Sequence, residues 1–415
     1  KLLHYNPKKS THIVGKVYVV VNGRIDRFMG SRESCHRRQR GSHRHNVRHF
    51  TVIMLRAGLI GLSSAGKTTL FNLLTRPNSG KSHPSGRSDA EEGLAHVPDI
   101  RLDHLTQIYQ PKKTTPATVT FVDMPTRRGT GAGALVDLTQ YRTADALLHI
   151  VRAFRDENVA HPEESINPAR DVRRMEDELI LADLAVAERR LERLKKDKKK
   201  GILKDNDLEI EVLKTCASAL SDGQSLRHTK LDKQAKKLLR GFQFLSAKPL
   251  LIVINVDEAD LSVSTEDSIR ELGLDDFLID PTVRVLLVCA KIELEIAELS
   301  PKDSEAFIAD LGLDGRGLVR VTQAAYELLG YISFFTAGED ECRAWSIPDG
   351  TAAKEAAGEI HTDLSRGFIR AEVVDYHDLV SRRSFSECRK HAELRLEGKD
   401  YIVRDGDVIN VRFAV

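Results

Sequence analysis

The sequence has no long hydrophobic run. None of its apolar stretches reaches the roughly 20 residues that a membrane-spanning helix needs, and nothing near residue 1 has the layout of a secretory signal. Hydrophobic residues make up 41% of the chain and charged residues 30%, which is typical of a water-soluble globular protein. We therefore expect a cytoplasmic protein that does not bind a membrane.

Cysteine is scarce and poorly spaced for either disulfides or zinc. The five residues are Cys35, Cys216, Cys289, Cys342 and Cys388. Their number is odd, they are far apart, and no pair has C-x-x-C spacing, which argues against a disulfide framework and against a zinc site. We expect reduced and mostly buried thiols.

Charge is distributed unevenly along the chain. Residues 1–53 contain 12 Lys and Arg against two acidic residues, a net charge of +10, and six of the fifteen histidines. The remaining residues, 54–415, then carry −8. The basic segment could be a nucleic-acid-binding arm. We favour the alternative, a leader that is disordered or not part of the fold.

Residues 61–68 read GLSSAGKT, a complete G-x-x-x-x-G-K-[ST] phosphate loop. An apolar run at 55–60 precedes it and helical apolar spacing at 69–74 follows it, so the loop joins a strand to a helix. Backbone N–H groups and the helix dipole then surround a polyphosphate, Lys67 reaches its β and γ oxygens, and Thr68 offers a hydroxyl to Mg²⁺. The expected nucleotide-binding residues here are Gly61, Ser63, Ser64, Ala65, Gly66, Lys67, Thr68 and Thr69.

Further apolar runs predict the other strands of a parallel sheet. The run 118–123 ends in Asp123, which we expect to hold Mg²⁺ through a water. Runs at 146–151, 249–254 and 283–288 follow. Ligands of such sheets bind at the carboxyl ends of the strands, so the base should meet Asn255, Val256 and Glu258, and the loop of Cys289, Ala290 and Lys291. The predicted fold is a doubly wound α/β nucleotide domain.

A long charged segment, about residues 171–246, interrupts this domain. Apolar residues at 184, 187, 191 and 194 form a helical seam, and those at 210, 213, 217 and 220 could supply an antiparallel partner. The lysine-rich residues 195–200 lie between them. We interpret this run as a solvated tip, with RNA contact as the alternative.

Taken together, these residues resemble the YchF-type family of Obg-like P-loop ATPases. The resemblance runs from about Met54 to Val415. The motifs that carry it in the first part are VPDIRLD at 97–103, YRTADA at 141–146 and NVDE at 255–258. Those in the last part are FFTAG at 334–338, RAWSIP at 343–348, AGEIHTD at 357–363 and EGKDYIV at 397–403.

The resemblance implies three parts and a function. Residues 54–331 would form the nucleotide domain with a helical coiled-coil insertion, and residues 332–415 a β-grasp domain of the TGS type. The resemblance also implies a ribosome-associated ATPase that can bind GTP as well. We therefore expect the ribosome, as large subunit or 70S particle, and ribosomal RNA as partners, and a monomer.

The base-reading segment favours ATP. GTPases use Asn-Lys-x-Asp, where the aspartate accepts both N–H donors of the guanine edge. Here Val256 stands at the lysine position and Glu258 at the aspartate position. A displaced carboxylate loses a guanine-specific contact of about 1–3 kcal/mol, so ATP should at least be tolerated.

The sequence departs from the family where hydrolysis is organised. The Asp-x-x-Gly switch appears as DMPT at 123–126, with Thr126 at the glycine position. No glutamine that could orient water follows; the family associates a loop histidine with that role, and His161 matches it. The first switch lacks the family's threonine pattern, which leaves Ser88 as a weak substitute Mg²⁺ ligand. We assign the catalytic roles to His161 and Lys67.

These features predict a slow Mg²⁺-dependent nucleotide switch that acts in translation or stress response. ATP, or GTP, would be the substrate and Mg²⁺ the cofactor. The alternative is a nucleotide-sensing scaffold for RNA or protein with negligible hydrolysis. A small-molecule kinase is poorly supported, because the helical insertion and the TGS-like domain offer no evident acceptor pocket.

Overall fold

The computed structural model describes residues 55–75, 91–124, 138–200, 207–262, 264–313 and 315–414. The basic leader at 1–53, Ser88 and the Thr126 switch position lie outside the described residues. The chain forms two compact units. One contains residues 54–98 and 118–330, and the other contains residues 99–117 and 331–415.

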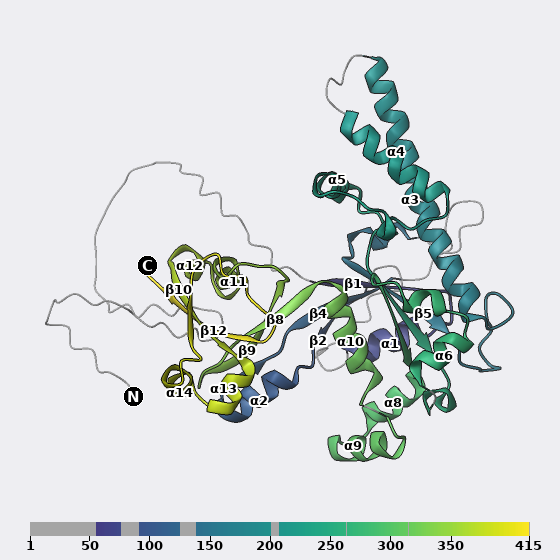
Figure 1. Cartoon of the computed structure of the whole chain (residues 1–415). Coiled ribbons are helices and arrows are strands. Elements are labelled where there is room, and N and C mark those ends of the chain that lie inside the picture. Colours follow the sequence, from purple (N-terminus) through teal and green to yellow (C-terminus); the bar gives the residue numbers. More distant parts are fainter. Residues whose placement is uncertain are drawn as a thin grey trace, which may run out of the picture. The chain divides into compact units, whose positions relative to one another are not determined.

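The first unit is built on a six-stranded sheet with the order β2-β4-β1-β5-β6-β7 (Figure 1). Its strands are β1 (Arg56–Ile60), β2 (Glu91–His96), β4 (Thr118–Asp123), β5 (Ala146–Arg152), β6 (Leu250–Asn255) and β7 (Val283–Val288). In the order β4-β1-β5-β6-β7, each strand pairs in parallel with the next, and β2 pairs antiparallel to β4 at the edge of the sheet. Every residue of β5 and β6 is buried, as expected for parallel strands covered on both faces.

Helices and short turns connect these strands. They are α1 (Lys67–Thr75), η2 (Thr139–Thr143), η5 (Glu258–Ser262), α6 (Thr265–Glu271), α7 (Asp275–Leu278), α8 (Ala290–Glu298), α9 (Pro301–Asp310) and α10 (Gly317–Leu328). Since β1, β4, β5, β6 and β7 run in one direction, their carboxyl ends meet at one edge of the sheet. The phosphate loop leaves β1 at that edge. The predicted doubly wound nucleotide fold is confirmed.

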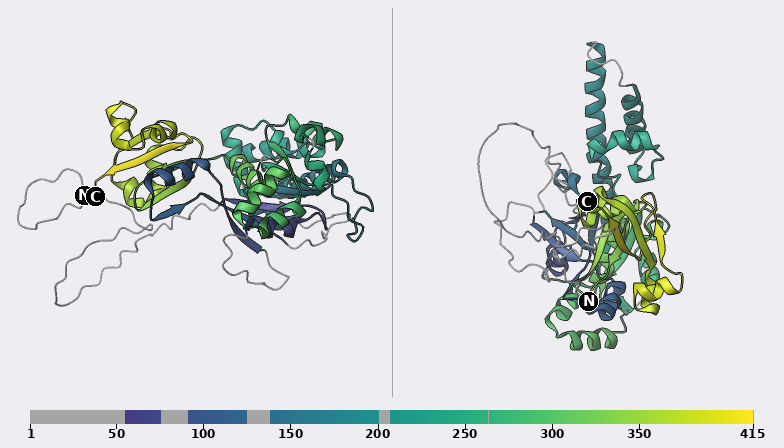
Figure 2. Two further views of the ribbon diagram at one scale, coloured as in Figure 1. Left: turned by 90° about the horizontal axis from the view of Figure 1, so that it is seen from below. Right: turned by 90° about the vertical axis from the view of Figure 1, so that its left-hand side faces the viewer.

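The predicted insertion is a helical arm of the first unit. It consists of α3 (Pro168–Lys199), α4 (Asp207–Ser221), η3 (Leu226–His228), α5 (Lys233–Leu239) and η4 (Arg240–Phe242). Asn167 caps α3 by accepting a hydrogen bond from Arg170 N–H, and Pro168 occupies its first turn, where a missing N–H costs nothing. Figures 1 and 2 show α3 extending away from the sheet with α4 beside it.

The predicted apolar seam holds the arm together. Ala187, Leu191 and Leu194 of α3 are buried in one cluster with Leu213 and Leu220 of α4. The lysine-rich run forms the exposed last turn of α3 rather than a loop, and Lys198 pairs with Asp207 at the start of α4.

Asp183 anchors the arm to the sheet. Its carboxylate is fully buried and accepts hydrogen bonds from Arg142 (2.9 Å) and from the backbone N–H (2.7 Å) and hydroxyl (2.8 Å) of Ser246. Arg142 belongs to η2 before β5, and Ser246 lies shortly before β6. One side chain of α3 therefore satisfies donors from two segments that enter the sheet.

The second unit has its own six-stranded sheet, in the order β11-β10-β12-β8-β9-β3. Its strands are β3 (Lys113–Thr115), β8 (Tyr331–Thr336), β9 (Glu341–Pro348), β10 (Phe368–Asp375), β11 (Arg395–Glu397) and β12 (Asp407–Phe413). Its helices are α2 (Ile100–Tyr109), α11 (Ala353–Ile360), α12 (Thr362–Arg366), α13 (Tyr376–Arg382) and α14 (Phe385–Lys390). Mixed strand directions with helices against the sheet agree with the expected TGS-like domain.

Residues 99–117 belong to the second unit, and not to the nucleotide domain for which the sequence predicts them. There β3 forms an edge strand parallel to β9. Arg101 of α2 makes an ion pair with Asp405 (2.6 Å), and Lys112 pairs with Asp340 (2.7 Å). These partners are remote in sequence, so local patterns gave no sign of them.

Two compositional expectations can be compared with the structure. Across the described part of the chain, no helix combines the length and the apolar character needed to cross a bilayer. Four of the five cysteines fall in described segments, and all four are buried free thiols, as expected.

Replacing Asp183 with alanine should destabilise the protein by roughly 3–5 kcal/mol, since Arg142 and Ser246 would lose a shared buried acceptor. Thermal or urea unfolding measures this loss. Asp177→Ala, an exposed change on the same helix, is the matched control and should alter stability by at most about 0.5 kcal/mol. Equal stability of the two variants would contradict the anchoring role of Asp183.

Candidate nucleotide-binding site

The phosphate loop has the backbone that its glycines permit. Gly61 has φ +145°, and a Cβ there would lie 2.3 Å from the carbonyl oxygen of Ile150. Gly66 has φ +97°, and a Cβ there would lie 2.5 Å from Nδ2 of Asn255. Both positions therefore exclude a side chain on grounds of conformation and space. Ser63 and Ser64 are exposed at the tip of the loop.

Lys67 lies folded against its own loop. Its ammonium donates hydrogen bonds to the carbonyl oxygens of Gly61 (3.0 Å) and Leu62 (2.8 Å), and the residue is only 7% exposed. Burial lowers the pKa of Lys67 to about 8, although the charge of Asp123 opposes this shift. A buried ammonium held only by neutral carbonyls favours an incoming anion.

Thr68 and Asp123, the two expected Mg²⁺ ligands, form a hydrogen bond with each other. The Thr68 hydroxyl donates to one carboxylate oxygen of Asp123 at 3.0 Å. The other oxygen, Oδ1, is buried and has no hydrogen-bond partner among the described residues. Burial raises the pKa of Asp123, partly offset by the Thr68 hydrogen bond and the Lys67 charge.

This pair suits a hard cation. A buried carboxylate oxygen without a partner is costly, and Mg²⁺ binds through one or two protein oxygens together with phosphates and water. Within the described segments, no cluster of three or more His, Cys, Asp or Glu side chains could hold a metal alone. Thr68 and Asp123 could therefore hold Mg²⁺ together with the phosphates of a nucleotide, and not as part of a site made of protein ligands alone. The weak candidate Ser88 lies outside the described residues.

Asn255 joins two loops of the site. Its buried amide donates to the carbonyl oxygen of Ala65 (3.2 Å) and accepts from the backbone N–H of Ala290 (3.0 Å). The phosphate loop is thereby tied to the start of α8, where Cys289 is the residue that joins β7 to the helix and Ala290 and Lys291 are its first two residues. Cys289 and Ala290 are buried and Lys291 is exposed.

Two neighbours of Asn255 differ in their exposure. Val256 is 2% exposed and belongs to the core cluster of the sheet, so its side chain is not open to a base in this structure. Glu258 begins η5 and is exposed, which leaves it free to meet a ligand.

Asp257 and Arg152 contribute contacts that the sequence analysis missed. The Asp257 carboxylate accepts from the backbone N–H of Arg155, with oxygens at 3.2 and 3.4 Å. Arg152, 3% exposed, donates to the carbonyl oxygens of Phe154 (3.2 Å), Asp156 (3.1 Å) and Val159 (2.9 Å). The sequence holds one sign of this role, an arginine directly at the end of an apolar strand. It shapes the loop that leads to His161.

His149 is a second buried polar residue of β5. It is 1% exposed, its Nδ1 atom has no hydrogen-bond partner among the described residues, and it pairs in register with Ile60 at the end of β1. Burial, reinforced by the charge of Lys67, lowers the pKa of His149 to about 3. The imidazole is therefore neutral at physiological pH.

His161 is held in a closed arrangement. Its Nε2 lies 3.1 Å from a carboxylate oxygen of Asp171, and its Nδ1 accepts from the backbone N–H of Glu163 at 3.1 Å. The side chain is 5% exposed. Both ring nitrogens are thus occupied in this state, and His161 would have to leave Asp171 before it could contact water at the phosphates.

Comparisons with known proteins show what the chain as a whole resembles. Residues 331–414 match the family model YchF-GTPase_C, described as a protein of unknown function (DUF933). The ribosome-binding ATPase YchF of Bacillus subtilis is 38% identical over 370 residues, which cover 87% of this chain and 100% of that protein. The protein of the same name from Escherichia coli O157:H7 is 38% identical over 367 residues, covering 87% and 99%. The solved structure of the Schizosaccharomyces pombe YchF GTPase has a TM-score of 0.75 and 28% identity, covering 86% and 97%.

The depressed pKa of Lys67 predicts a pH-dependent affinity. Below about pH 8 the free protein carries the ammonium that pairs with phosphate, and above it this charge is lost. Affinity for Mg²⁺–ATP should therefore fall about tenfold between pH 7 and pH 9, as measured by calorimetric titration.

Two variants control for this effect. Lys67→Arg keeps its charge at both pH values and should remove the decline. Lys67→Ala should bind more than about tenfold more weakly at pH 7 and show a flat profile. Unchanged affinity in Lys67→Ala would contradict the assignment of the phosphate loop.

Proposed function

The chain belongs to the YchF family, and on that premise we propose that it is a ribosome-associated P-loop ATPase that works as a slow, Mg²⁺-dependent nucleotide switch in the cytoplasm. One observation carries this proposal. Thr68 and Asp123 meet at 3.0 Å beside the buried Lys67, so a hydroxyl, a carboxylate and an ammonium converge where β1 and β4 end.

Binding would begin with an exchange of partners at Lys67. The β and γ phosphates of ATP compete with the Gly61 and Leu62 carbonyls for its ammonium, and a phosphate oxygen is the stronger acceptor because it is charged. Backbone N–H groups of residues 61–68 surround the phosphates at the start of α1. The bound Mg²⁺ would supply charge neutralisation at the phosphates, with Thr68 and Asp123 as its protein ligands.

The base would be read at the ends of β6 and β7. Glu258 is exposed at the start of η5, and the backbone of residues 289–291 borders the same edge. Asn255 connects the phosphate loop to the start of α8 through its two hydrogen bonds, to Ala65 and from Ala290. We therefore assign Asn255 a positioning role and leave base contact to Glu258 and the residue 289–291 turn.

The loop after β5 would transmit the nucleotide state. Asp257, next to the base-reading residues, holds the backbone of Arg155, and Arg152 fixes the same loop through three carbonyls. A change at the base site can therefore reach His161, which lies in the continuation of this loop. Release of His161 from Asp171 would then allow it to orient water.

Ribosome binding is proposed from the relatives that are named ribosome-binding ATPases. The exposed last turn of α3, with its lysines, is a candidate for contact with RNA. The basic pairs at 382–383 and 389–390 of the second unit are less available, because Arg382 binds Glu393, Arg389 binds Glu372 and Lys390 binds Glu387. We propose a monomer.

A scaffold without turnover remains the second candidate. The closed state of His161, with both ring nitrogens occupied, favours it, as does the residue at position 126, which the sequence gives as threonine rather than glycine. In that case nucleotide would still bind and alter the loops, and hydrolysis would not be required.

Phosphate release from ATP distinguishes the two candidates. Purified protein should release phosphate slowly alone and faster with ribosomes, because partner contacts complete the hydrolytic site. Lys67→Ala, measured with and without ribosomes, gives the background. Rates equal to that background under both conditions would favour the scaffold.

Removing the imidazole of His161 should slow hydrolysis at least tenfold without weakening ATP binding, as expected for a group that acts in the transition state. Single-turnover rates and titrated affinities separate the two effects. His228→Ala removes another carboxylate-paired histidine of the same unit and should leave the rate unchanged. Equal rates for His161→Ala and wild type would exclude the histidine from the mechanism.

The wild-type protein should bind ATP at least as tightly as GTP. Val256→Lys with Glu258→Asp should shift preference towards GTP by about tenfold, or roughly 1.4 kcal/mol. Because Val256 is buried, Glu258→Asp alone serves as the variant with an intact core and should shift preference in the same direction by less. Much tighter GTP binding by wild type would contradict the ATPase assignment and leave the phosphate loop assignment intact.

A further inference from the structure

A cavity lies at the amino ends of strands β5, β6 and β7 of the nucleotide-domain sheet. It has a volume of about 530 Å³, within the range of small-molecule sites. Asp145, Pro249 and Thr282 line it, directly before β5, β6 and β7 respectively. Its other wall comes from η3, α5 and η4 at the base of the helical arm. The phosphate loop, by contrast, lies at the carboxyl ends of these strands.

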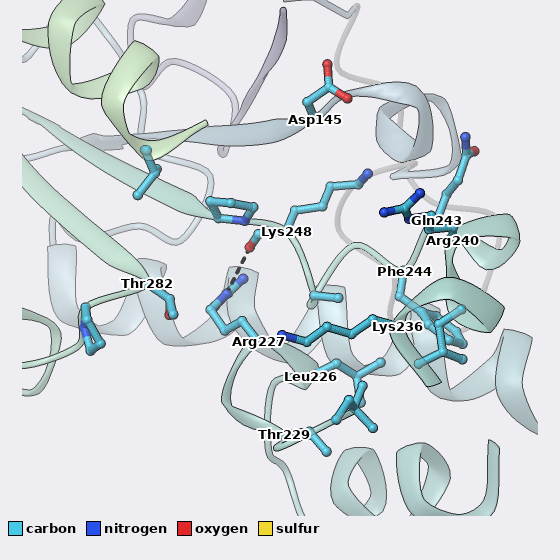
Figure 3. A pocket seen from close by; sticks show the side chains of 16 residues that line it. Asp145, Leu226, Arg227, Thr229, Lys236, Arg240, Gln243, Phe244, Lys248 and Thr282 are labelled. Atoms are coloured by element: carbon cyan, nitrogen blue, oxygen red, sulfur yellow. Dashed lines mark hydrogen bonds between the residues drawn. The ribbon is translucent and has the colours of Figure 1, made fainter. Parts of the chain in front are cut away.

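The cavity is strongly cationic. Arg227, Lys236, Arg240 and Lys248 line it, and Asp145 is the one carboxylate among the lining residues (Figure 3). Figure 3 shows the side chain of Lys236 pointing towards Arg227, and that of Lys248 pointing towards Arg240. In the part of the chain that the structure describes, neither Lys236 nor Arg240 has an ion-pair partner, and both are exposed.

Arg227 is buried with an unsatisfied donor. Its side chain is 2% exposed and pairs with Glu176 at 2.6 Å. Its Nε donates to the Lys248 carbonyl oxygen (3.1 Å), which Figure 3 marks with a dashed line. Nη2, however, has no hydrogen-bond partner among the described residues. A buried N–H without an acceptor is unfavourable, and Arg227 contributes this positive charge to the lining of the cavity.

Lys248 adds a partly desolvated ammonium. It donates to the carbonyl oxygens of Arg142 and Ala144. Burial lowers its pKa, while the charges of Asp145 and Asp183 act in the opposite direction. A bound anion would restore the interaction that water no longer provides.

Charge and shape together define the ligand. The negative charge of Asp145 offsets one of the four positive charges of the lining, and Glu176 offsets that of Arg227. Two positive charges are left uncompensated. A phosphate monoester carries nearly two negative charges at neutral pH and three acceptor oxygens. The remaining wall is apolar and suits the carbon part of such a molecule; it consists of Leu226, Leu231, Leu239, Phe244, Pro281 and Leu328.

We propose that this cavity binds a phosphate monoester, with its phosphate between Lys236, Arg240 and Lys248 and its organic part against the apolar wall. Asp145 offers an acceptor for a hydroxyl of the ligand. The occupant would link the base of the helical arm to the amino edge of the sheet, independently of ATP. The phosphate could belong to a free metabolite or to the 5′ end of an RNA strand, which share this chemistry.

Calorimetric titration of the full chain tests the proposal, with the phosphate loop first saturated by Mg²⁺–ADP. The small probes are ribose 5-phosphate and, as its phosphate-free match, ribose. The RNA probes are one dodecamer with a 5′ phosphate and the same dodecamer with a 5′ hydroxyl. Binding of ribose 5-phosphate but not ribose supports a free ligand. RNA binding that needs the 5′ phosphate supports an RNA end.

Matched variants locate the binding. Lys236→Ala with Arg240→Ala should weaken binding of the phosphorylated probe at least tenfold. Lys237→Ala changes the next exposed lysine of α5, which does not line the cavity, and should stay within twofold of wild type. Unfolding curves confirm that both variants fold.

Several outcomes would overturn the proposal. They are the absence of saturable binding by either phosphorylated probe at millimolar concentration, equal binding with and without the phosphate, and unchanged binding in the double variant.

Discussion

The amide of Asn255 is the contact on which the nucleotide site depends. It is a single buried side chain at the end of β6, and its two polar atoms bind the phosphate loop and the first residue of α8. A Cβ on Gly66 would collide with it. The phosphate loop can therefore approach the amide this closely only with glycine at position 66. Sheet hydrogen bonds set the strands in register, and this amide then sets the spacing of the two loops that leave them. An aspartate there would lose the donor to Ala65, and an alanine would lose both contacts.

Much of the site could be predicted because its signals are local. The phosphate loop, Asp123 at the end of a strand, and the apolar seam of the arm each appear within a short window of sequence, and the structure places Thr68 against Asp123 and Ala187 beside Leu213. The parallel order of the strands follows from the same reasoning, since strands buried on both faces are apolar throughout.

What could not be predicted depends on partners that are distant in sequence. Arg152 and His149 lie in an apolar strand, and only the folded chain gives Arg152 its carbonyls and His149 its place near Lys67. Val256 has the sequence position of a base contact, but its side chain is buried in the core cluster of the sheet. The arrangement of His161 with Asp171 likewise depends on how a loop meets α3.

The membership of residues 99–117 in the second unit has a consequence for biosynthesis. The edge strand β3 and helix α2 leave the ribosome early, but the strands they accompany begin at Tyr331. At about 5–20 residues per second, synthesis of residues 118–330 imposes a delay of roughly 10–40 s. During that interval the early segment has no sheet to join, so the second unit can complete its fold only after its strands from β8 onwards have been synthesised. An expression fragment that starts at residue 331 would lack this segment altogether.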